Sequence, residues 1–249
     1  MNNSVNVSRE LYLELLKKSI LNEIYLEYEP DANIISRHQG RDWPAAAHSM
    51  IGRERMNHLQ TCLTNIIEEN IEGDVIETGV WRGGACIFMR GFFKACEVTD
   101  RLVWVADSFE GLPKPDSKYP MDASSLCHTL ERLKISLEEV KKNFEKYDLL
   151  DDQVKFLKGW FKDTLPTAPI EKIAIARLDG DMYSSTIDAL NSLYAKVSPG
   201  GYVIIDDFSI PNCSTAVHDF RKEHGIKEPI VKIDWTGVYW KKSKETKRI

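Results

Sequence analysis

Short apolar runs alternate with helix-like segments from residue 73 onward, and this alternation constrains the fold more than any other feature of the chain. Each run has the length of a buried strand and is followed by a polar or glycine-rich turn. Strands that alternate with helices predict a doubly wound α/β fold with a mostly parallel sheet. The five runs are DVIET (74–78), LVWVAD (102–107), VKFLKG (154–159), IAIARLD (173–179) and YVIID (202–206).

Capping and turn signals place the helices of this α/β part. Ser136 and Glu139 fit a capping box at the start of a helix over 136–147. The helix after Ser184 has one apolar stripe that extends to Val197, and it is predicted to stop at Pro199–Gly201. A long loop with three prolines follows the second run. The chain ends with a predicted helix over 213–224 and a terminal hairpin formed by IVKIDW (230–235) and VYWKK (238–242).

The first 72 residues carry no strand signal. Their apolar periodicity predicts one helix over 9–28 and a second over roughly 52–70, with a polar loop between them. We therefore divide the chain into a helical N-terminal extension (1–72), suited to act as a lid or a subunit interface, and the α/β domain (73–249). Helical extensions outside a core also suggest self-association, as a homodimer or a higher homo-oligomer.

Composition excludes several classes of protein. The net charge of −5 disfavours general nucleic-acid binding, which relies on clustered Lys and Arg. The five cysteines form no CxxC pair and the six histidines form no HExxH motif, so a zinc site is not expected. The N-terminus lacks the plan of a signal peptide, and no apolar stretch is long enough to span a membrane. We expect a cytoplasmic protein with reduced thiols.

Four aspartates follow the fourth and fifth runs. Asp179 and Asp181 stand in ARLDGDMY, and Asp206 and Asp207 stand in YVIIDDF. Parallel strands end at the same edge of a sheet, so both pairs should converge on one crevice. Carboxylates that converge repel each other unless a cation lies between them, and a set of oxygen ligands alone favours Mg²⁺. The alternative is that these acids cap the helices that follow.

A glycine-rich turn follows the first run. It reads E-x-G-x-x-x-G from Glu77 to Gly83, which resembles the first motif of class I S-adenosylmethionine-dependent methyltransferases rather than the GxGxxG of a dinucleotide site. The second run ends in Asp107, where an acid can bind the ribose hydroxyls of an adenosine group. Glu77 would then face the amino-acid end of the cofactor. The alternative is that both acids cap helices.

Longer motifs sharpen this likeness. DVIETGVWRGGACIFMRG, VWVADSFEGLPKPD, KGWFKDTLP, RLDGDMYSSTIDAL, SPGGYVIIDDF and DWTGVYW together resemble the macrocin O-methyltransferase family, the TylF-like enzymes, over about residues 11–240. The resemblance implies an S-adenosylmethionine-dependent O-methyltransferase that requires Mg²⁺ and acts on a sugar hydroxyl of a small glycosylated natural product of the macrolide type. It also implies a class I methyltransferase sheet of seven strands, the last antiparallel.

The resemblance also assigns roles to individual residues. Asp179, Asp206 and Asp207 are the expected Mg²⁺ ligands. The chemistry also needs a base that takes the proton from the hydroxyl, and we expect Asp181, two residues past Asp179 in the turn, to be that base, with Asp179 as the alternative. The expected cofactor-binding residues are Glu77, Thr78, Gly79 and Arg82 on the methionine side, Asp107 and Ser108 at the ribose, and Gly159 and Trp160 beside the adenine, with Asp179 close to the cofactor.

Other functions remain open at this point. The acceptor could be a polysaccharide or a nucleotide sugar instead of a small glycoside. A nicotinamide-dependent oxidoreductase would use a similar sheet, but it would leave the four strand-end carboxylates unexplained and would need GxGxxG. A catalytically silent binding protein on the same scaffold would not need those acids.

Overall fold

The computed structural model describes residues 2–29 and 31–243, and its centre is one seven-stranded sheet. The strand order is β3-β2-β1-β4-β5-β7-β6, and β7 runs antiparallel to both of its neighbours. This is the predicted doubly wound, mostly parallel sheet with an antiparallel last strand. The strands are β1 Asp74–Thr78, β2 Val103–Asp107, β3 Val154–Lys158, β4 Ile173–Leu178, β5 Val197–Ile205, β6 Val231–Lys232 and β7 Val238–Lys241.

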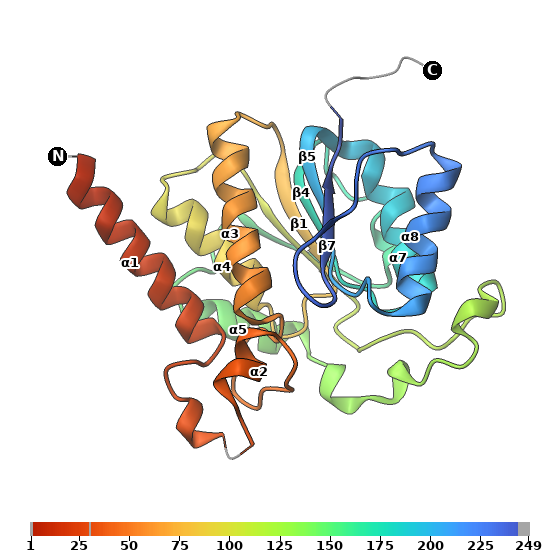
Figure 1. The fold of residues 1–249 in the computed structure, drawn as a ribbon, viewed down its shortest axis with the longest axis horizontal. Coiled ribbons are helices and arrows are strands. Elements are labelled where there is room, and N and C mark those ends of the chain that lie inside the picture. The colour runs from red at the N-terminus through yellow and green to blue at the C-terminus, as the bar shows by residue number, and fades with distance from the viewer. Residues whose placement is uncertain (1, 30, 244–249) are drawn as a thin grey trace.

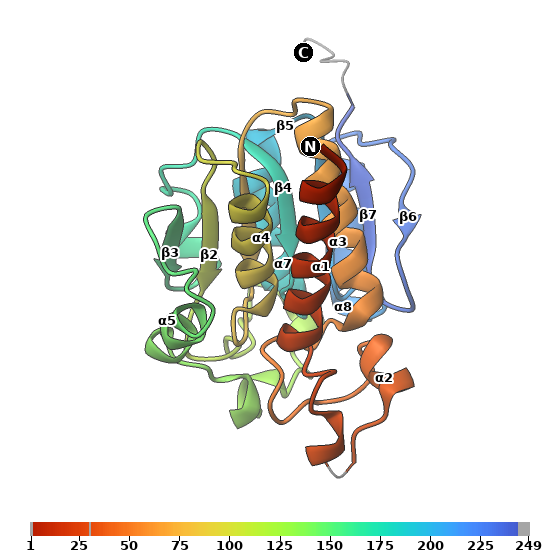
Figure 2. The same cartoon turned by 90° about the vertical axis from the view of Figure 1, so that its left-hand side faces the viewer.

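Helices cover both faces of this sheet (Figures 1 and 2). On one face lie α1 (Asn2–Ile20), α3 (Gly52–Glu68), α4 (Gly84–Ala95) and α5 (Leu137–Glu145), and on the other α7 (Tyr183–Leu193) and α8 (Pro211–Glu223). Among the described helices, none is long and apolar enough to cross a membrane. The short helices are α2 Ile34–His38 and α6 Phe161–Thr164, with 3₁₀ turns at Leu26–Tyr28, Pro120–Asp122, Cys127–Thr129, Glu131–Leu133 and Tyr194–Lys196.

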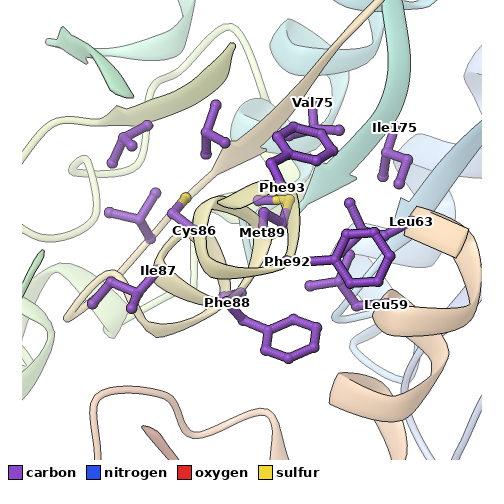
Figure 3. Packing of buried hydrophobic residues seen from close by; sticks show 14 of the residues in the cluster. Leu59, Leu63, Val75, Cys86, Ile87, Phe88, Met89, Phe92, Phe93 and Ile175 are labelled. Carbon is purple, nitrogen blue, oxygen red and sulfur yellow. The ribbon is translucent and has the colours of Figure 1, made fainter. Parts of the chain in front are cut away.

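The N-terminal helices share a core with the sheet. Leu59 and Leu63 of α3 lie against Phe92 of α4 in the same buried cluster as Val75 of β1 (Figure 3). Leu13, Leu16 and Ile20 of α1 belong to that cluster as well. Removing these apolar side chains from water is the main force that holds the extension in place. The boundary between the N-terminal extension and the α/β domain at residue 72 stays a prediction.

Three predicted helix ends were wrong. The first helix begins at Asn2 and not at residue 9. The first helix stops at Ile20, because Asn22 adopts a positive φ of 49° and the chain turns into a loop. The helix after Ser184 stops at Leu193, and Val197 begins β5 instead. The backbone of residues 197–201 pairs with β4 and with Lys242, so Pro199 and Gly200 lie within the strand and not in a helix stop.

Two loops gather at the carboxyl ends of the parallel strands. Residues 21–29 and 31–51 and the loop 108–136 lie at the lower end of the molecule in Figure 1. The predicted cap at Ser136 is present, since its hydroxyl accepts a hydrogen bond from the Glu139 N–H at 3.1 Å. These loops enclose the edge at which ligands bind in this class of fold.

Candidate active site

A cavity of about 650 Å³ opens at the carboxyl edge of the sheet. Residues that follow β1, β2, β3, β4 and β5 line it, together with the β6–β7 turn and both loops. Its size is typical of small-molecule sites. Of the residues predicted from sequence, those on its wall are Glu77, Gly79, Asp107, Ser108, Trp160, Asp179, Asp181, Asp206 and Asp207.

Three of the four aspartates form one cluster. Carboxylate oxygens of Asp179, Asp181 and Asp207 all lie within 4.8 Å of one another. Burial, together with the neighbouring Asp179 and Asp206 charges, raises the pKa of Asp181 to about 7. Burial and repulsion from nearby carboxylates also raise the pKa values of Asp179 and Asp207 well above the ordinary value. A divalent cation would relieve this repulsion, and an all-oxygen donor set suits Mg²⁺.

The fourth aspartate, Asp206, forms ion pairs with two arginines. One of its carboxylate oxygens accepts from the Arg177 guanidinium and the other from the Arg55 guanidinium. Burial favours the neutral acid, but the two arginines outweigh burial and lower the pKa of Asp206. Asp206 thus lies on the cavity wall and belongs to a buried network of ion pairs. No observation tests its expected role as a metal ligand, which stays a prediction.

Arg177, inside β4, connects the two halves of the site. Its guanidinium donates to Glu77 at 2.6 Å and to Asp179 at 3.0 Å, in addition to Asp206. Arg55 of α3 extends the network to the β6–β7 turn, since its Nε lies 3.1 Å from Asp234 as an ion pair without hydrogen-bond geometry. Sequence reasoning missed both residues. An arginine within the apolar run IAIARLD was a usable signal for Arg177, but Arg55 gave none.

The glycine turn lies directly against the acids. Gly79 has a φ of +79°, and a Cβ at this position would stand 1.8 Å from the carbonyl oxygen of Asp179. Only glycine allows this approach. Asp107 accepts from the Val80 N–H at 2.8 Å and the Phe109 N–H at 2.7 Å, which fixes its carboxylate beside the turn. The chain thus builds the acid-and-glycine arrangement that a nucleoside cofactor requires.

Three predicted cofactor residues do not line the cavity. Thr78 is buried within the sheet, and Gly159 turns the chain after β3. Arg82 instead donates to the carbonyl oxygens of Ala45 at 2.8 Å and Ala47 at 2.9 Å. Its guanidinium therefore ties the glycine turn to the N-terminal loop.

The loop 108–136 is tied to the start of α7. The fully buried Asp122 accepts from the backbone N–H groups of Tyr183 at 2.9 Å and Ser184 at 2.8 Å. The Tyr119 hydroxyl also donates to Asp188 at 3.1 Å. Asp122 acts as an N-cap from a distant part of the chain, so that the free N–H groups of α7 hold the loop over the cavity.

Comparison with known proteins agrees with this architecture. The family model described as Macrocin-O-methyltransferase (TylF) matches residues 29–242. The chain belongs to this family. It is therefore an O-methyltransferase, and the resemblance seen in its motifs is confirmed. The nicotinamide-dependent alternative is set aside.

Individual relatives cover nearly the whole chain. Mycinamicin III 3''-O-methyltransferase of Micromonospora griseorubida is 52% identical over 246 residues, which are 94% of this chain and 97% of that protein. A tetracenomycin-type relative from Streptomyces olivaceus, 8-demethyl-8-(2,3-dimethoxy-alpha-L-rhamnosyl)-tetracenomycin-C 4'-O-methyltransferase, is 50% identical over 94% of this chain and 93% of its own length. The solved O-methyltransferase NovP superimposes with a TM-score of 0.92 at 48% identity, covering 95% of this chain and 100% of NovP.

Proposed function

We propose that this protein transfers a methyl group from S-adenosylmethionine to a sugar hydroxyl of a small glycosylated natural product, with Mg²⁺ bound beside the reacting hydroxyl. The observation that carries the proposal is the cluster of Asp179, Asp181 and Asp207 next to the glycine turn. The relatives from Micromonospora and Streptomyces, whose names specify methylation of glycosylated antibiotics, support the class of acceptor.

The cofactor fits the residues that follow β1, β2 and β3. Asp107 would bind the ribose hydroxyls, Glu77 would face the amino group of the methionine part, and Trp160 would lie beside the adenine. Arg177 orients Glu77, because its guanidinium donates to Oε1 while the Cys86 thiol donates to Oε2. Burial raises the pKa of Glu77, and the Arg177 charge opposes that rise. When bound, S-adenosylmethionine supplies a methyl group that is already activated by the sulfonium charge.

The metal fits the acid cluster. We propose that Asp179 and Asp207 hold the ion and that Asp181 accepts the proton of the acceptor hydroxyl; the raised pKa of Asp181, about 7, suits a base at neutral pH. When bound, Mg²⁺ lowers the pKa of a hydroxyl oxygen and orients it. The backbone N–H of Asp181 donates to Asp207 at 3.1 Å and keeps the two carboxylates in one orientation. Asp206 would stabilise the site through Arg55 and Arg177, and its ligand role stays a prediction.

Mass spectrometry of products tests the reaction. The protein is incubated with S-adenosylmethionine and mycinamicin III or a panel of rhamnosides, with Mg²⁺ or with EDTA. We expect the acceptor to gain the mass of one methyl group per sugar in the presence of Mg²⁺, and we expect EDTA to abolish this gain. Asp181→Asn should lose turnover but keep Mg²⁺ binding in calorimetry, whereas Asp207→Asn should lose both. If the protein methylates a polysaccharide or a nucleotide sugar but none of the small glycosides, the acceptor belongs to one of those two alternative classes instead.

The setting of the reaction is part of the same proposal. All five cysteines are free thiols, as expected for a reducing compartment such as the cytoplasm. The exposed apolar side chains Val7, Leu11 and Leu15 along α1 support assembly into a homodimer or a larger homo-oligomer. Light scattering of the purified protein tests the assembly, and a monomer at micromolar concentration would refute it.

A further inference from the structure

The order of strands at the carboxyl edge separates two sides of the cavity. The predicted cofactor groups follow β1, β2 and β3, and the acids follow β4 and β5. Beyond the acids, next to β5, lies the β6–β7 turn with Trp235 and Thr236. The Thr236 hydroxyl donates to the backbone oxygen of Asp206 at 3.1 Å, so this turn adjoins the acids on the side away from the cofactor. Trp235 therefore lines the cavity at the end away from the cofactor residues, whereas Trp43 lines it nearer the glycine turn, where Arg82 donates to the carbonyl oxygen of Pro44.

Residues 39–47, which we call the strap, run across the mouth of the cavity. One end is fixed to the β6–β7 turn, because the indole N–H of Trp235 donates to the carbonyl oxygen of Gln39 at 2.7 Å and Arg41 stacks on the indole at 4.3 Å. The other end is fixed to the glycine turn by Arg82, as described above. The buried Arg37, just before the strap, also binds its Asp42 at 2.7 Å.

Two tryptophans on the wall of the cavity are exposed and yet held in place. Trp43 of the strap is 48% exposed and Trp235 is 39% exposed. The guanidinium of Arg132 lies 3.6 Å from the Trp43 ring centroid, and Trp235 is held by Gln39 and Arg41. Large aromatic rings that are fixed before a ligand arrives form a binding surface at a low cost in entropy.

We propose that Trp235 and Trp43 form the acceptor subsite and bind the apolar body of an amphipathic glycoside whose sugar hydroxyl reaches Asp181. This assignment rests on the proposed function and adds the part of the acceptor that the enzyme selects. Flat indole faces bind the apolar faces of sugar and aglycone through burial and ring contacts. The strap and the β6–β7 turn thus determine specificity, while the acids determine the chemistry.

Binding to the protein saturated with S-adenosylhomocysteine tests the subsite. Calorimetry measures the Kd of mycinamicin III for wild type, Trp235→Ala, Trp43→Ala and Trp235→Phe. Loss of one stacked indole should weaken binding by about tenfold or more, whereas Trp235→Phe should stay within about threefold of wild type. The Kd of S-adenosylhomocysteine should not change. The matched control is Tyr28→Ala, which removes an aromatic ring that is 77% exposed and does not line the cavity.

The probes separate the possible results. A methyl rhamnoside, which lacks an apolar body, should bind weakly and be insensitive to both tryptophan variants. Wild-type affinity for mycinamicin III in Trp235→Ala and Trp43→Ala, with circular dichroism showing folded protein, would overturn the subsite while leaving the proposed reaction intact. Tighter binding of a thymidine diphosphate sugar than of the macrolide glycoside would overturn the acceptor class. A wild-type protein that neither binds nor methylates any glycoside would refute the proposed function itself, and the subsite with it.

Discussion

Replacing Arg177 is the most direct test of how the site is held together. This arginine is buried in β4 and is an ion-pair partner of Glu77, Asp179 and Asp206. In Arg177→Met, Asp206 keeps Arg55, but Glu77 keeps only the Cys86 thiol. Breaking a buried ion pair from one side leaves an uncompensated charge and costs about 3–5 kcal/mol. We expect the free energy of unfolding to fall by about 4 kcal/mol.

A second buried arginine provides the control. Arg90 of α4 is nearly as buried as Arg177, but within the described part of the chain its one ion pair is with Asp151, a carboxylate that is 36% exposed. Partly solvated single pairs contribute about 1 kcal/mol or less, so Arg90→Met should lose far less stability than Arg177→Met. Arg177→Lys keeps the charge but cannot reach three carboxylates with one planar group, and it should fall between them.

Urea unfolding at pH 7 in the presence of EDTA gives the comparison. Far-UV circular dichroism and tryptophan fluorescence should report one transition, which permits the free energies to be compared at equal slope. A loss below about 1 kcal/mol for Arg177→Met, or a loss equal to that of Arg90→Met, would refute the view that Arg177 neutralises the acids at the centre of the site.

Three further outcomes follow from the same contacts. Saturating Mg²⁺ at about ten times its Kd should stabilise the wild type by about 1.4 kcal/mol in thermal unfolding, whereas Asp207→Asn should show no shift; an equal shift in both would place the ion elsewhere. Asp122→Ala should cost about 2 kcal/mol in urea unfolding and make the loop 108–136 easier to cleave by protease, because α7 loses its cap; unchanged stability would refute the capping role. Burial lowers the pKa values of His48 and His58 to about 4 each, so the unfolded chain takes up protons before the folded protein as the pH falls. The free energy of unfolding should therefore decline between about pH 6.5 and 4 by on the order of 1 kcal/mol for each histidine. A His48→Gln, His58→Gln double variant whose stability declines as steeply as that of the wild type would contradict this.

The fold was largely predictable because local signals agreed with one another. Each predicted strand run pairs in the sheet, and the terminal hairpin forms as expected. The errors lie where contacts between residues far apart in the sequence determine the ends of an element. The strand β5 begins at Val197 because β4 and Lys242 offer hydrogen bonds to residues 197–201, and no local pattern contains that information.

The site was predictable in residue type but not in pairing. Runs that end in acids placed Asp107, Asp179 and Asp207 at one edge, as the structure has them. The partner of Asp206 was not foreseeable, since Arg55 lies 151 residues away in the chain, on a helix that was assigned to the extension. Arg82 was placed by motif alone, and motif similarity does not reveal that its guanidinium meets the carbonyl groups of the strap.

The adjacent residues Asp206 and Asp207 have different electrostatic environments. Asp206 and Asp207 follow the end of β5 at Ile205, and their carboxylates have different partners. Asp206 meets two guanidinium groups, which lower its pKa. Asp207 lies in the cluster with Asp179 and Asp181, and burial with the charges of Asp181 and Asp206 raises its pKa. One acid of the pair thus carries a compensated charge within the framework. The other has no cationic partner among the described residues, which supports our proposal that Asp207 holds the metal ion, while a ligand role for Asp206 stays a prediction.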